Sequence, residues 1–250
     1  MPDRGGRAVV ALAAATVLAQ VAYPLVRGDA RDTLTVVTVV LFAATSLLHA
    51  GLTRGPRTAL LLLLVAGGGG LVAEAVGVAT GVPFGRYEYA DSLGPALLGV
   101  PVVIPLAWVM MTWPAHLVAA RLARSRAGRV AVGAVALAAW DLFLDPQMVD
   151  AGHWRWADPL PALPGVPTVP LTNYAGWLLV AALLMLLLPV PGPGDDRVPY
   201  ALYLWTYASS VLAHLAFFGL PASALWGGLG MGLVAVPLAL SLRRRVPAPA

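Results

Sequence analysis

Residues 58–79 read TALLLLLVAGGGGLVAEAVGVA, an apolar run that contains one charged residue, Glu74. A helix needs about 20 apolar residues to cross the roughly 30 Å hydrocarbon layer of a membrane. The run therefore predicts a membrane-spanning helix, and the four consecutive glycines Gly67–Gly70 favour close packing against a neighbouring helix. A carboxylate inside such a helix is costly, so Glu74 is a candidate functional residue, with an ion pair to Arg86 as the structural alternative.

The composition of the whole chain agrees with this interpretation. Of 250 residues, 59% are apolar and 11% are charged, and the mean hydropathy is +0.80. A soluble domain carries about 25% charged residues, so we expect a polytopic membrane protein. The chain has no cysteine, which excludes disulfides, thiolate nucleophiles and zinc–thiolate sites.

Seven further apolar runs predict an all-α, polytopic membrane helix bundle of about eight transmembrane helices, forming one integral membrane domain over residues 1–250. The expected spans are 7–26, 33–52, 58–79, 100–121, 129–149, 171–190, 198–218 and 221–242. The first run follows Arg4 and Arg7, as a signal peptide would. It is longer than a signal core and lacks a small-residue cleavage site, so we expect a helix there.

The arginines predict the orientation of these helices. If the N-terminus is cytoplasmic, twelve of the sixteen arginines fall in inner segments, and Arg27, Arg31, Arg86 and Arg155 fall in outer ones. This bias predicts that both ends are cytoplasmic in a multi-pass protein of the cell membrane. Basic residues between helices report topology, so the net charge of +4 does not indicate a nucleic-acid partner. The apolar spans predict that membrane lipid surrounds the protein.

Most of the acids then fall at the outer edge, and residues 140–158, WDLFLDPQMVDAGHWRWAD, are the densest group. Asp141 and Asp145 are four residues apart, so they share one helix face. Two neighbouring carboxyl groups repel when both are ionised, which keeps one protonated, as a general acid requires. A capping or salt-bridge role is the alternative. Pro146 is expected to end or kink the helix.

Several other polar and aromatic residues are expected at the same depth as these carboxylates. The outer loops carry Tyr87, Tyr89, Trp154 and Trp156, which are either membrane-belt residues or rings that stabilise a cation. Supporting residues at this edge are Arg86, Glu88, Arg155, Asn173 and His214. The arginines could instead anchor the loops, and His214 could instead make structural hydrogen bonds. Convergence of these side chains into one pocket is a hypothesis that depth alone does not establish.

Motifs for other membrane chemistries do not occur. The chain lacks paired Asp-rich clusters for a prenyl transferase, a serine motif for a rhomboid-type protease and the histidine clusters of a desaturase. We therefore expect no metal site and no cofactor.

A series of motifs from about residue 74 to 177 resembles the carotenoid biosynthesis membrane family that includes CruF-type carotenoid 1',2'-hydratases and bisanhydrobacterioruberin hydratases. Several long motifs keep their order, whereas the flanking helices match in hydropathy alone. The motifs are Gly81–Tyr89, Leu93–Pro95, Gly99–Pro101, Ile104–Trp108, Asp141–Met148, Trp154–Trp156 and Pro170–Trp177.

The resemblance implies an enzyme that adds water to the terminal C1'=C2' double bond of an acyclic carotenoid (C40 or C50), in contact with other enzymes of the pathway. This suits the residues, because protonating an unactivated alkene needs an acid and no cofactor. In this hypothesis Asp141 or Asp145 protonates the alkene, and Glu74 or the other aspartate tunes that acid or activates water. The aromatic residues line the cation site, while Arg86, Asn173 and His214 hold the carboxylates and the water.

Two other functions are compatible with the same residues. A lycopene-type end-group cyclase shares the protonation step but excludes water from the cation. A non-enzymatic carotenoid or lipid carrier binds pigment without changing it. The mass of the product separates the first alternative from hydration, and tolerance of carboxylate substitutions separates the second.

Overall fold

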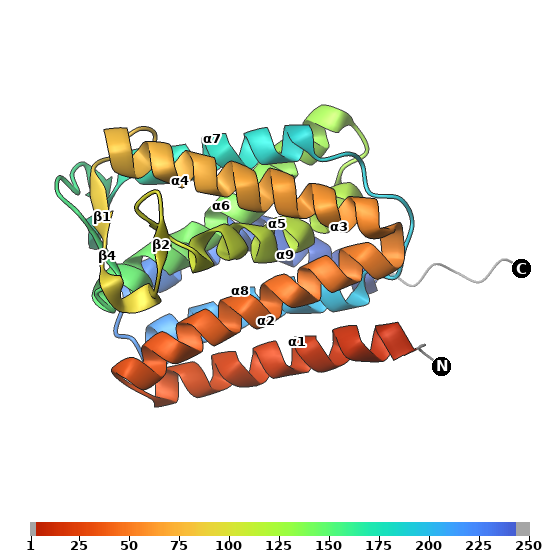
Figure 1. The fold of residues 1–250 in the computed structure, drawn as a ribbon, viewed down its shortest axis with the longest axis horizontal. Helices are drawn as coiled ribbons and strands as arrows, with labels where there is room; N and C mark the ends of the chain where they lie inside the picture. The colour runs from red at the N-terminus through yellow and green to blue at the C-terminus, as the bar shows by residue number, and fades with distance from the viewer. Residues whose placement is uncertain (1–3, 244–250) are drawn as a thin grey trace, which may run out of the picture.

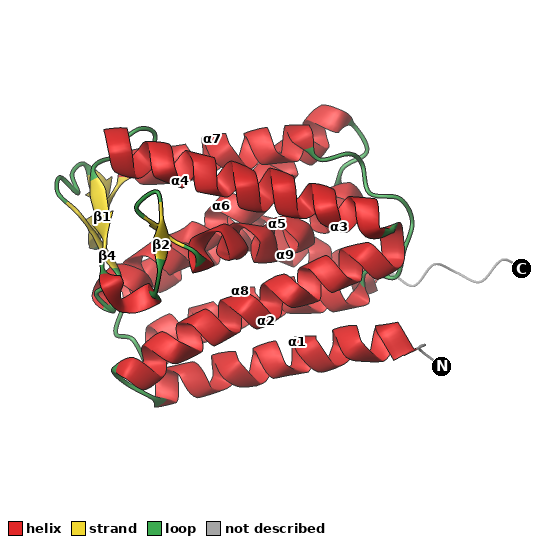
Figure 2. Ribbon diagram, in the orientation of Figure 1, coloured by secondary structure: helices red, strands yellow, loops and turns green. Residues whose placement is uncertain are grey.

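The computed structural model describes residues 4–243, which form a bundle of long helices with short strands at one end (Figures 1 and 2). The helices are α1 (Arg4–Ala22), η1 (Tyr23–Leu25), α2 (Asp29–Arg54), α3 (Pro56–Leu62), η2 (Leu63–Gly68), α4 (Gly69–Thr80), η3 (Asp91–Leu93), α5 (Val103–Leu122), α6 (Arg126–Asp150), α7 (Leu171–Leu187), α8 (Arg197–Ala216) and α9 (Pro221–Arg243). The strands are β1 (Tyr87–Tyr89), β2 (Ala96–Leu97), β3 (Val100–Pro101), β4 (Trp154–Trp156), β5 (Ala162–Leu163) and β6 (Val166–Pro170). Helix α1 begins and helix α9 ends at the end of the bundle opposite the strands (Figure 1).

The all-α membrane bundle is confirmed. Within the described residues, six helical segments are long and apolar enough to cross a membrane. They are Arg4–Leu25, Asp29–Arg54, Pro56–Thr80, Val103–Leu122, Arg126–Asp150 and Pro221–Arg243. Helix α7 is apolar but shorter, and α8 is not among the six. The count of eight spans and the cytoplasmic location of both ends stay predictions; Asp3, Arg244 and Arg245, which entered the charge pattern, lie outside the described residues.

Short strands in the connections at one end of the bundle were not predicted. Three antiparallel pairs form there, β1 with β4, β2 with β3, and β5 with β6. Each strand is only two to five residues long. Alternation over so few residues is a weak sequence signal, although Tyr-Glu-Tyr and Trp-Arg-Trp do alternate.

Helix α5 is the core of the bundle and lies in its middle (Figure 1). Nearly all of its residues are buried, including Trp108 and Trp113. Lipid tails are as apolar as leucine side chains, so van der Waals packing rather than hydrophobic burial holds such helices together. Trp108 lies towards the strand-capped end and Trp113 lies more than one turn further from it.

A continuous helical rod, made of α3, the π-helical η2 and α4, carries Glu74 against this core. A Cβ built on Gly70 would lie 2.5 Å from Cγ of Trp108, so the glycine lets α4 approach α5 closely. Glu74 is one turn further along and therefore lies on the same face as Gly70. The four-glycine run thus sets the distance between Glu74 and Trp108.

Helix α6 does not end at Pro146, as was one of the two expectations, but continues to Asp150. Proline has no N–H, so the carbonyl of Leu142 loses its partner inside the helix. The Ser223 hydroxyl of α9 donates to that carbonyl at 2.7 Å. The next carbonyl, of Phe143, lies 3.0 Å from Nε2 of His214. Ser223 of a neighbouring helix therefore supplies the hydrogen bond that the proline removed, as membrane bundles require, and His214 adds a contact at the next carbonyl.

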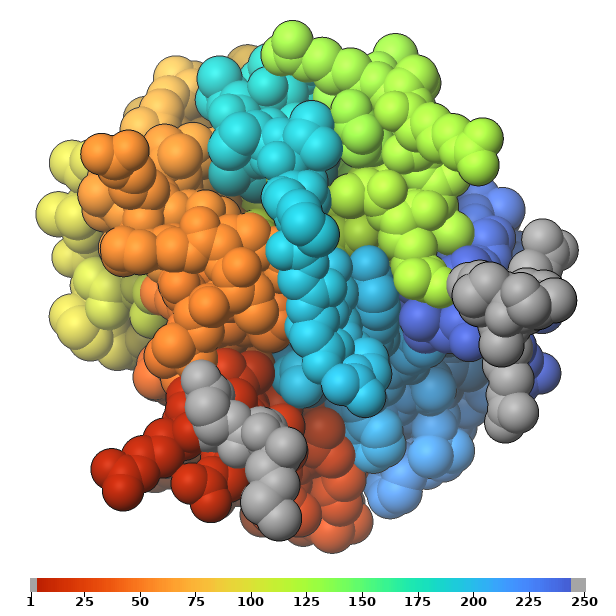
Figure 3. All heavy atoms as spheres, turned by 90° about the vertical axis from the view of Figure 1, so that its right-hand side faces the viewer, coloured from red at the N-terminus to blue at the C-terminus, as the bar shows by residue number. Residues whose placement is uncertain are grey.

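The opposite end of the bundle is closed by the connection between α7 and α8, residues 188–196. It crosses the middle of that face, coloured cyan in Figure 3. Its carbonyls are bound by side chains of the core: Nε2 of His49 lies 2.9 Å from Asp195 O, and Nε2 of His116 lies 2.9 Å from Pro189 O. Arg54 donates to Gly192 O and forms an ion pair with Asp196. These two histidines therefore have a structural role.

The glycine run provides a matched test of the packing between α4 and α5. Gly70→Ala is expected to destabilise the protein by about 1–3 kcal/mol, because its Cβ overlaps Trp108. Gly68→Ala meets no atom within 4 Å. It is expected to be neutral or to stabilise by up to about 1 kcal/mol through helix propensity. Thermal unfolding of both variants in detergent checks this; equal melting temperatures would show that Gly70 does not set the helix distance.

Candidate active site

The strands β1 and β4 place four aromatic side chains over the end of the bundle. Their register pairs Tyr87 with Trp156 and Tyr89 with Trp154. The ring centroids of these pairs are 5.7 Å and 5.6 Å apart. Because side chains alternate between the faces of a strand, all four rings share the inner face. The two connections that carry β1 and β4, distant in sequence, therefore make one aromatic lid.

The middle residues of these strands, Glu88 and Arg155, face outward instead. They form an ion pair with each other, and their side chains are 62% and 79% exposed. An exposed pair of this kind contributes little stability. The strand period thus turns Glu88 and Arg155 away from the site carboxylates, and their supporting role stays a prediction.

Glu74 lies beneath this lid with its side chain 4% exposed. Its Oε2 accepts hydrogen bonds from the hydroxyls of Tyr87 at 2.5 Å and Tyr89 at 2.8 Å. Its Oε1 accepts one from Nε1 of Trp108 at 3.0 Å. Three donors to one carboxyl group favour its ionised form.

The two tyrosines of β1 can serve Glu74 as donors because their hydroxyls keep their protons. Burial, and after it the nearby Glu74 carboxylate, raises the pKa of both Tyr87 and Tyr89 well above the ordinary value for tyrosine. Both phenols are therefore neutral at physiological pH and present an O–H to the carboxylate.

Asp141 and Asp145 face Asn173, which lies in the first turn of α7. Nδ2 of Asn173 donates to Oδ2 of Asp141 at 2.8 Å and also to Oδ2 of Asp145. Nε1 of Trp154 donates to Oδ1 of Asp145 at 3.0 Å. Oδ1 of Asp141 is buried and has no hydrogen-bond partner among the described residues. Asp145 thus has two donors and Asp141 has one, while the two carboxyl groups are within hydrogen-bonding reach of each other.

A cavity of about 30 Å³ lies between the two groups of carboxylates. Glu74, Asp145 and Asn173 line it, whereas Asp141 lies behind Asp145 and does not. This volume has room for one or two water molecules, and the carboxylates and amide supply their hydrogen bonds. Its aromatic lining consists of Phe84, Tyr87, Tyr89, Trp108, Trp154, Trp156 and Trp177. The cavity can therefore hold water beside an acid and under ring faces that stabilise positive charge.

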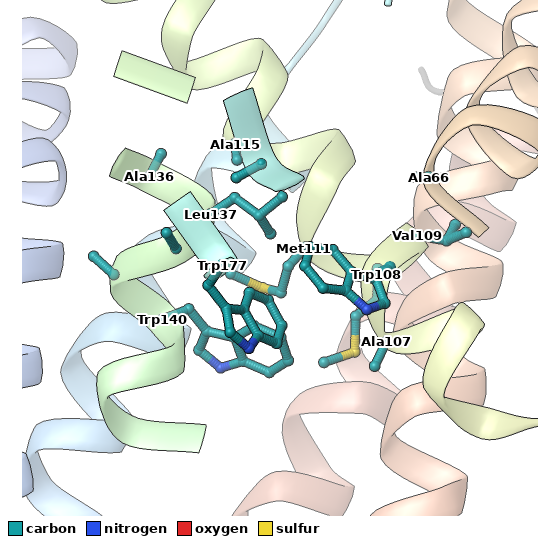
Figure 4. Close-up of a cluster of buried hydrophobic side chains, with 14 of the residues drawn as sticks. Ala66, Ala107, Trp108, Val109, Met111, Ala115, Ala136, Leu137, Trp140 and Trp177 are labelled. Carbon is teal, nitrogen blue, oxygen red and sulfur yellow. The ribbon is translucent and has the colours of Figure 1, made fainter. Parts of the chain in front are cut away.

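Like Phe84, the lining residues Trp108 and Trp177 were not predicted as site residues. Their rings stack with centroids 4.0 Å apart, and Trp140 meets Trp177 edge to face at 6.1 Å, in the buried cluster of Figure 4. Both residues lie inside the motifs of the family resemblance, Ile104–Trp108 and Pro170–Trp177, so the sequence did contain a signal for them.

Two predicted supporting residues, Arg86 and His214, do not reach the carboxylates. The Arg86 side chain is exposed and makes no ion pair within residues 4–243. His214 is buried, with Nδ1 2.8 Å from Ser210 O and Nε2 3.0 Å from Phe143 O. Its ring therefore contacts backbone carbonyls and not the carboxylates. One of these carbonyls, of Phe143, follows the Leu142 carbonyl that Pro146 leaves without an N–H partner. Neither side chain contacts the carboxylates among the described residues, and the supporting roles of Arg86 and His214 stay predictions.

The structure brings together the three predicted catalytic carboxylates, the four predicted aromatic residues and Asn173. Among the residues described, no group of three or more His, Cys, Asp or Glu is arranged to hold a metal ion. The side chains that line the cavity can transfer protons, form hydrogen bonds and stabilise positive charge with their ring faces.

His153 fixes the segment that leads from α6 into the lid. The side chain is fully buried, with Nδ1 2.7 Å from Oγ of Ser92 and Nε2 3.8 Å from Oδ1 of Asp32. Burial lowers the pKa of His153, while the Asp32 carboxylate acts in the opposite direction. The neutral imidazole therefore connects β4 to η3.

A family model described as carotenoid biosynthesis protein matches residues 33–193 of the chain. Among curated proteins, the chain is similar to the bisanhydrobacterioruberin hydratase of Haloarcula japonica, with 35% identity over 163 residues. The alignment covers 63% of this chain and 51% of that protein, so the chain spans about half the length of the curated relative it matches. No solved structure matches the chain. All residues that line the 30 Å³ cavity lie within the matched region.

The buried neutral His153 makes the stability of the lid depend on pH. Because its pKa is lowered in the folded state, the stability it contributes is present above the ordinary histidine value of about 6.5 and is lost as pH falls below it. Acidification below about pH 6.5 is expected to reduce the unfolding free energy by up to about 1.4 kcal/mol per pH unit. Thermal unfolding of the wild type and of His153→Gln between about pH 5 and 8, a range that brackets the ordinary histidine pKa, measures this. If the melting temperatures of the two proteins change with pH in parallel, the prediction is contradicted.

Proposed function

We propose that this chain, which belongs to the carotenoid biosynthesis protein family, is a carotenoid hydratase of the cell membrane. It adds water to the terminal C1'=C2' double bond of an acyclic carotenoid end group. The observation that carries the proposal is a water-sized, ring-lined cavity that Asp145 and Glu74 both line. The name of the Haloarcula relative, a hydratase, supports the same reaction class.

The reaction is the acid-initiated addition of water to an alkene. A carboxylic acid transfers its proton to C2', and the pair of π electrons forms the new C–H bond. C1' becomes a tertiary carbocation, and the oxygen of water bonds to it. The protonated alcohol then loses one proton to a carboxylate, so the enzyme ends with the number of protons it began with. The step consumes one water molecule and needs no oxidant or reductant.

Asp145 is the proposed proton donor, because it faces the cavity while Asp141 does not. Asn173 holds the two carboxyl groups together, and both are buried, so one shared proton is favoured over two negative charges. Asp141 acts through Asp145 and is a positioning residue. After the alkene has taken the proton, Asp145 carries the negative charge and faces the cation.

Glu74 is the proposed base that accepts the proton from the attacking water. Its three donors favour the ionised form until it takes that proton, which returns to the aspartate pair before the next turnover. Ring faces around the cavity stabilise the carbocation by about 0.5–2 kcal/mol each, the larger value applying where water is excluded. The proposed acid and the proposed base thus line the same cavity.

Substitution of the aspartates in lycopene-producing cells tests the proposal. Asp145→Asn is expected to reduce hydrated product by about 10²–10⁴-fold, the usual contribution of a general acid. Asp141→Asn is expected to lower the rate less and to shift its pH profile, because the proton on Asp145 loses its second carboxyl partner. Products are measured by mass spectrometry, as the gain of one water per hydrated end, at matched protein levels.

Asp150→Asn is the control, since Asp150 is an exposed acid of the same helix. It is expected to match the wild type. Full hydration by Asp145→Asn would refute the acid assignment. A cyclised product of unchanged mass would indicate the cyclase, and unchanged pigment bound to the wild type would indicate the carrier.

A further inference from the structure

The proposed chemistry requires a route from the bilayer to an enclosed cavity. Asp145 is 3% exposed and Glu74 is 4% exposed, so neither is open to lipid or bulk water. A cavity of about 30 Å³ also cannot hold the end of a polyene together with water. The end group must therefore occupy further space that adjoins this cavity.

A second, larger cavity adjoins the first. It has a volume of about 150 Å³ and lies between α1, α2, α5, α6 and α8, in the half of the bundle nearer the strands. The two cavities share four wall residues, Ile104, Ala107, Leu144 and Trp154. A cavity of this volume holds a six-carbon ring such as benzene. It therefore fits the five-carbon branched terminus of an acyclic isoprenoid.

A third hollow lies on the outside of the bundle, between α2 and the η3–β3 segment. Its volume is about 590 Å³, and Leu93 and Val103 separate it from the 150 Å³ cavity. Val37, Val40 and Val102 line it and are 37%, 44% and 46% exposed. In a membrane-spanning helix, exposed valines face the acyl chains, so this groove is open to lipid.

We propose that these three spaces are the path of the carotenoid. The polyene lies in the outer groove, passes between Leu93 and Val103, and places its end group in the 150 Å³ cavity. The terminal double bond then reaches Asp145 beside Ala107. This inference rests on the proposed hydratase function and adds the entry side and the end-group site.

The hydroxyls of the 150 Å³ cavity fit the group that hydration creates. The oxygens of Tyr23, Thr38 and Thr206 are buried there without a hydrogen-bond partner within the described part of the chain. Buried hydroxyls without partners are costly, so a bound group that pairs with them is favoured. The product is a tertiary alcohol, and these hydroxyls can bind it as the end group withdraws.

Part of this cavity lies outside the region that the family model matches. Residues of α1, η1 and α8 form one wall, and the match covers residues 33–193. The carboxylates belong to the matched region, whereas this wall does not. We therefore infer that the α1–α8 wall selects the end group, and that the chemistry takes place at the carboxylates within the region matched by the family model.

A matched pair of variants on α8 tests the end-group site. Ala213→Leu adds three carbon atoms at the cavity wall, and Ala208→Leu adds the same atoms on the exposed side of the helix. Both are made in the Asp145→Asn protein and purified from lycopene-making cells. Bound lycopene per protein, measured by absorbance, is expected to fall at least about fivefold with Ala213→Leu, as overpacking predicts. Ala208→Leu is expected to retain the parent value.

A second pair of variants tests the outer groove, with both substitutions at exposed positions and none in the buried core. Val37→Trp fills the lipid-facing groove, while Val10→Trp places the same ring on exposed α1. In the active protein, Val37→Trp is expected to reduce hydration at least about fivefold, and Val10→Trp to leave it unchanged. If Ala213→Leu retains the amount of lycopene bound by its Asp145→Asn parent, the proposed carotenoid path is overturned. The path is also overturned if Val37→Trp forms hydrated product at the wild-type level. Lycopene bound as expected with no hydrated product from the wild type overturns the hydratase and retains the path.

Discussion

The cost of burying Glu74 in a membrane helix determines much of this structure. An ionised carboxylate without partners inside hydrocarbon costs many kcal/mol, and here it has three hydrogen-bond donors. One donor comes from the core helix α5, and two come from β1. The strand can supply them because it pairs with β4, and α4 approaches α5 because Gly70 has no side chain. The rod, the core helix and the lid therefore meet at one side chain.

Backbone hydrogen bonds are the second constraint, and they explain which polar residues are not part of the site. Within a bilayer no water can satisfy a free carbonyl, so polar side chains at the same depth are needed for the backbone as well as for chemistry. Pro146 leaves the Leu142 carbonyl free, and Ser223 binds it, while His214 binds the next carbonyl. Depth alone therefore could not separate His214 from Asn173, which does bind both aspartates.

The sequence predicted the helical class and the shared depth of the carboxylates, because span length and arginine bias depend on local composition. It also predicted that Asp141 and Asp145 share a face. It could not predict which helices face each other, and so it missed the stack of Trp108 on Trp177. The outward direction of Glu88 and Arg155 follows from strand period, but three-residue strands between membrane helices are too short to be identified from alternation.

The three carboxyl groups differ in their number of hydrogen-bond donors, and this difference bears on the two proton transfers of the proposed reaction. Glu74 has three donors, Asp145 has two and Asp141 has one, so negative charge is most stable on Glu74 and a proton is most stable within the aspartate pair. The space between Asp145 and Glu74 is large enough for water but not for a folded end group. An end group that enters from the 150 Å³ cavity can bring its last double bond to Asp145 while the rest of its chain stays outside. Capture of the cation by water then requires less space than ring closure, and the size of the cavity favours hydration over cyclisation.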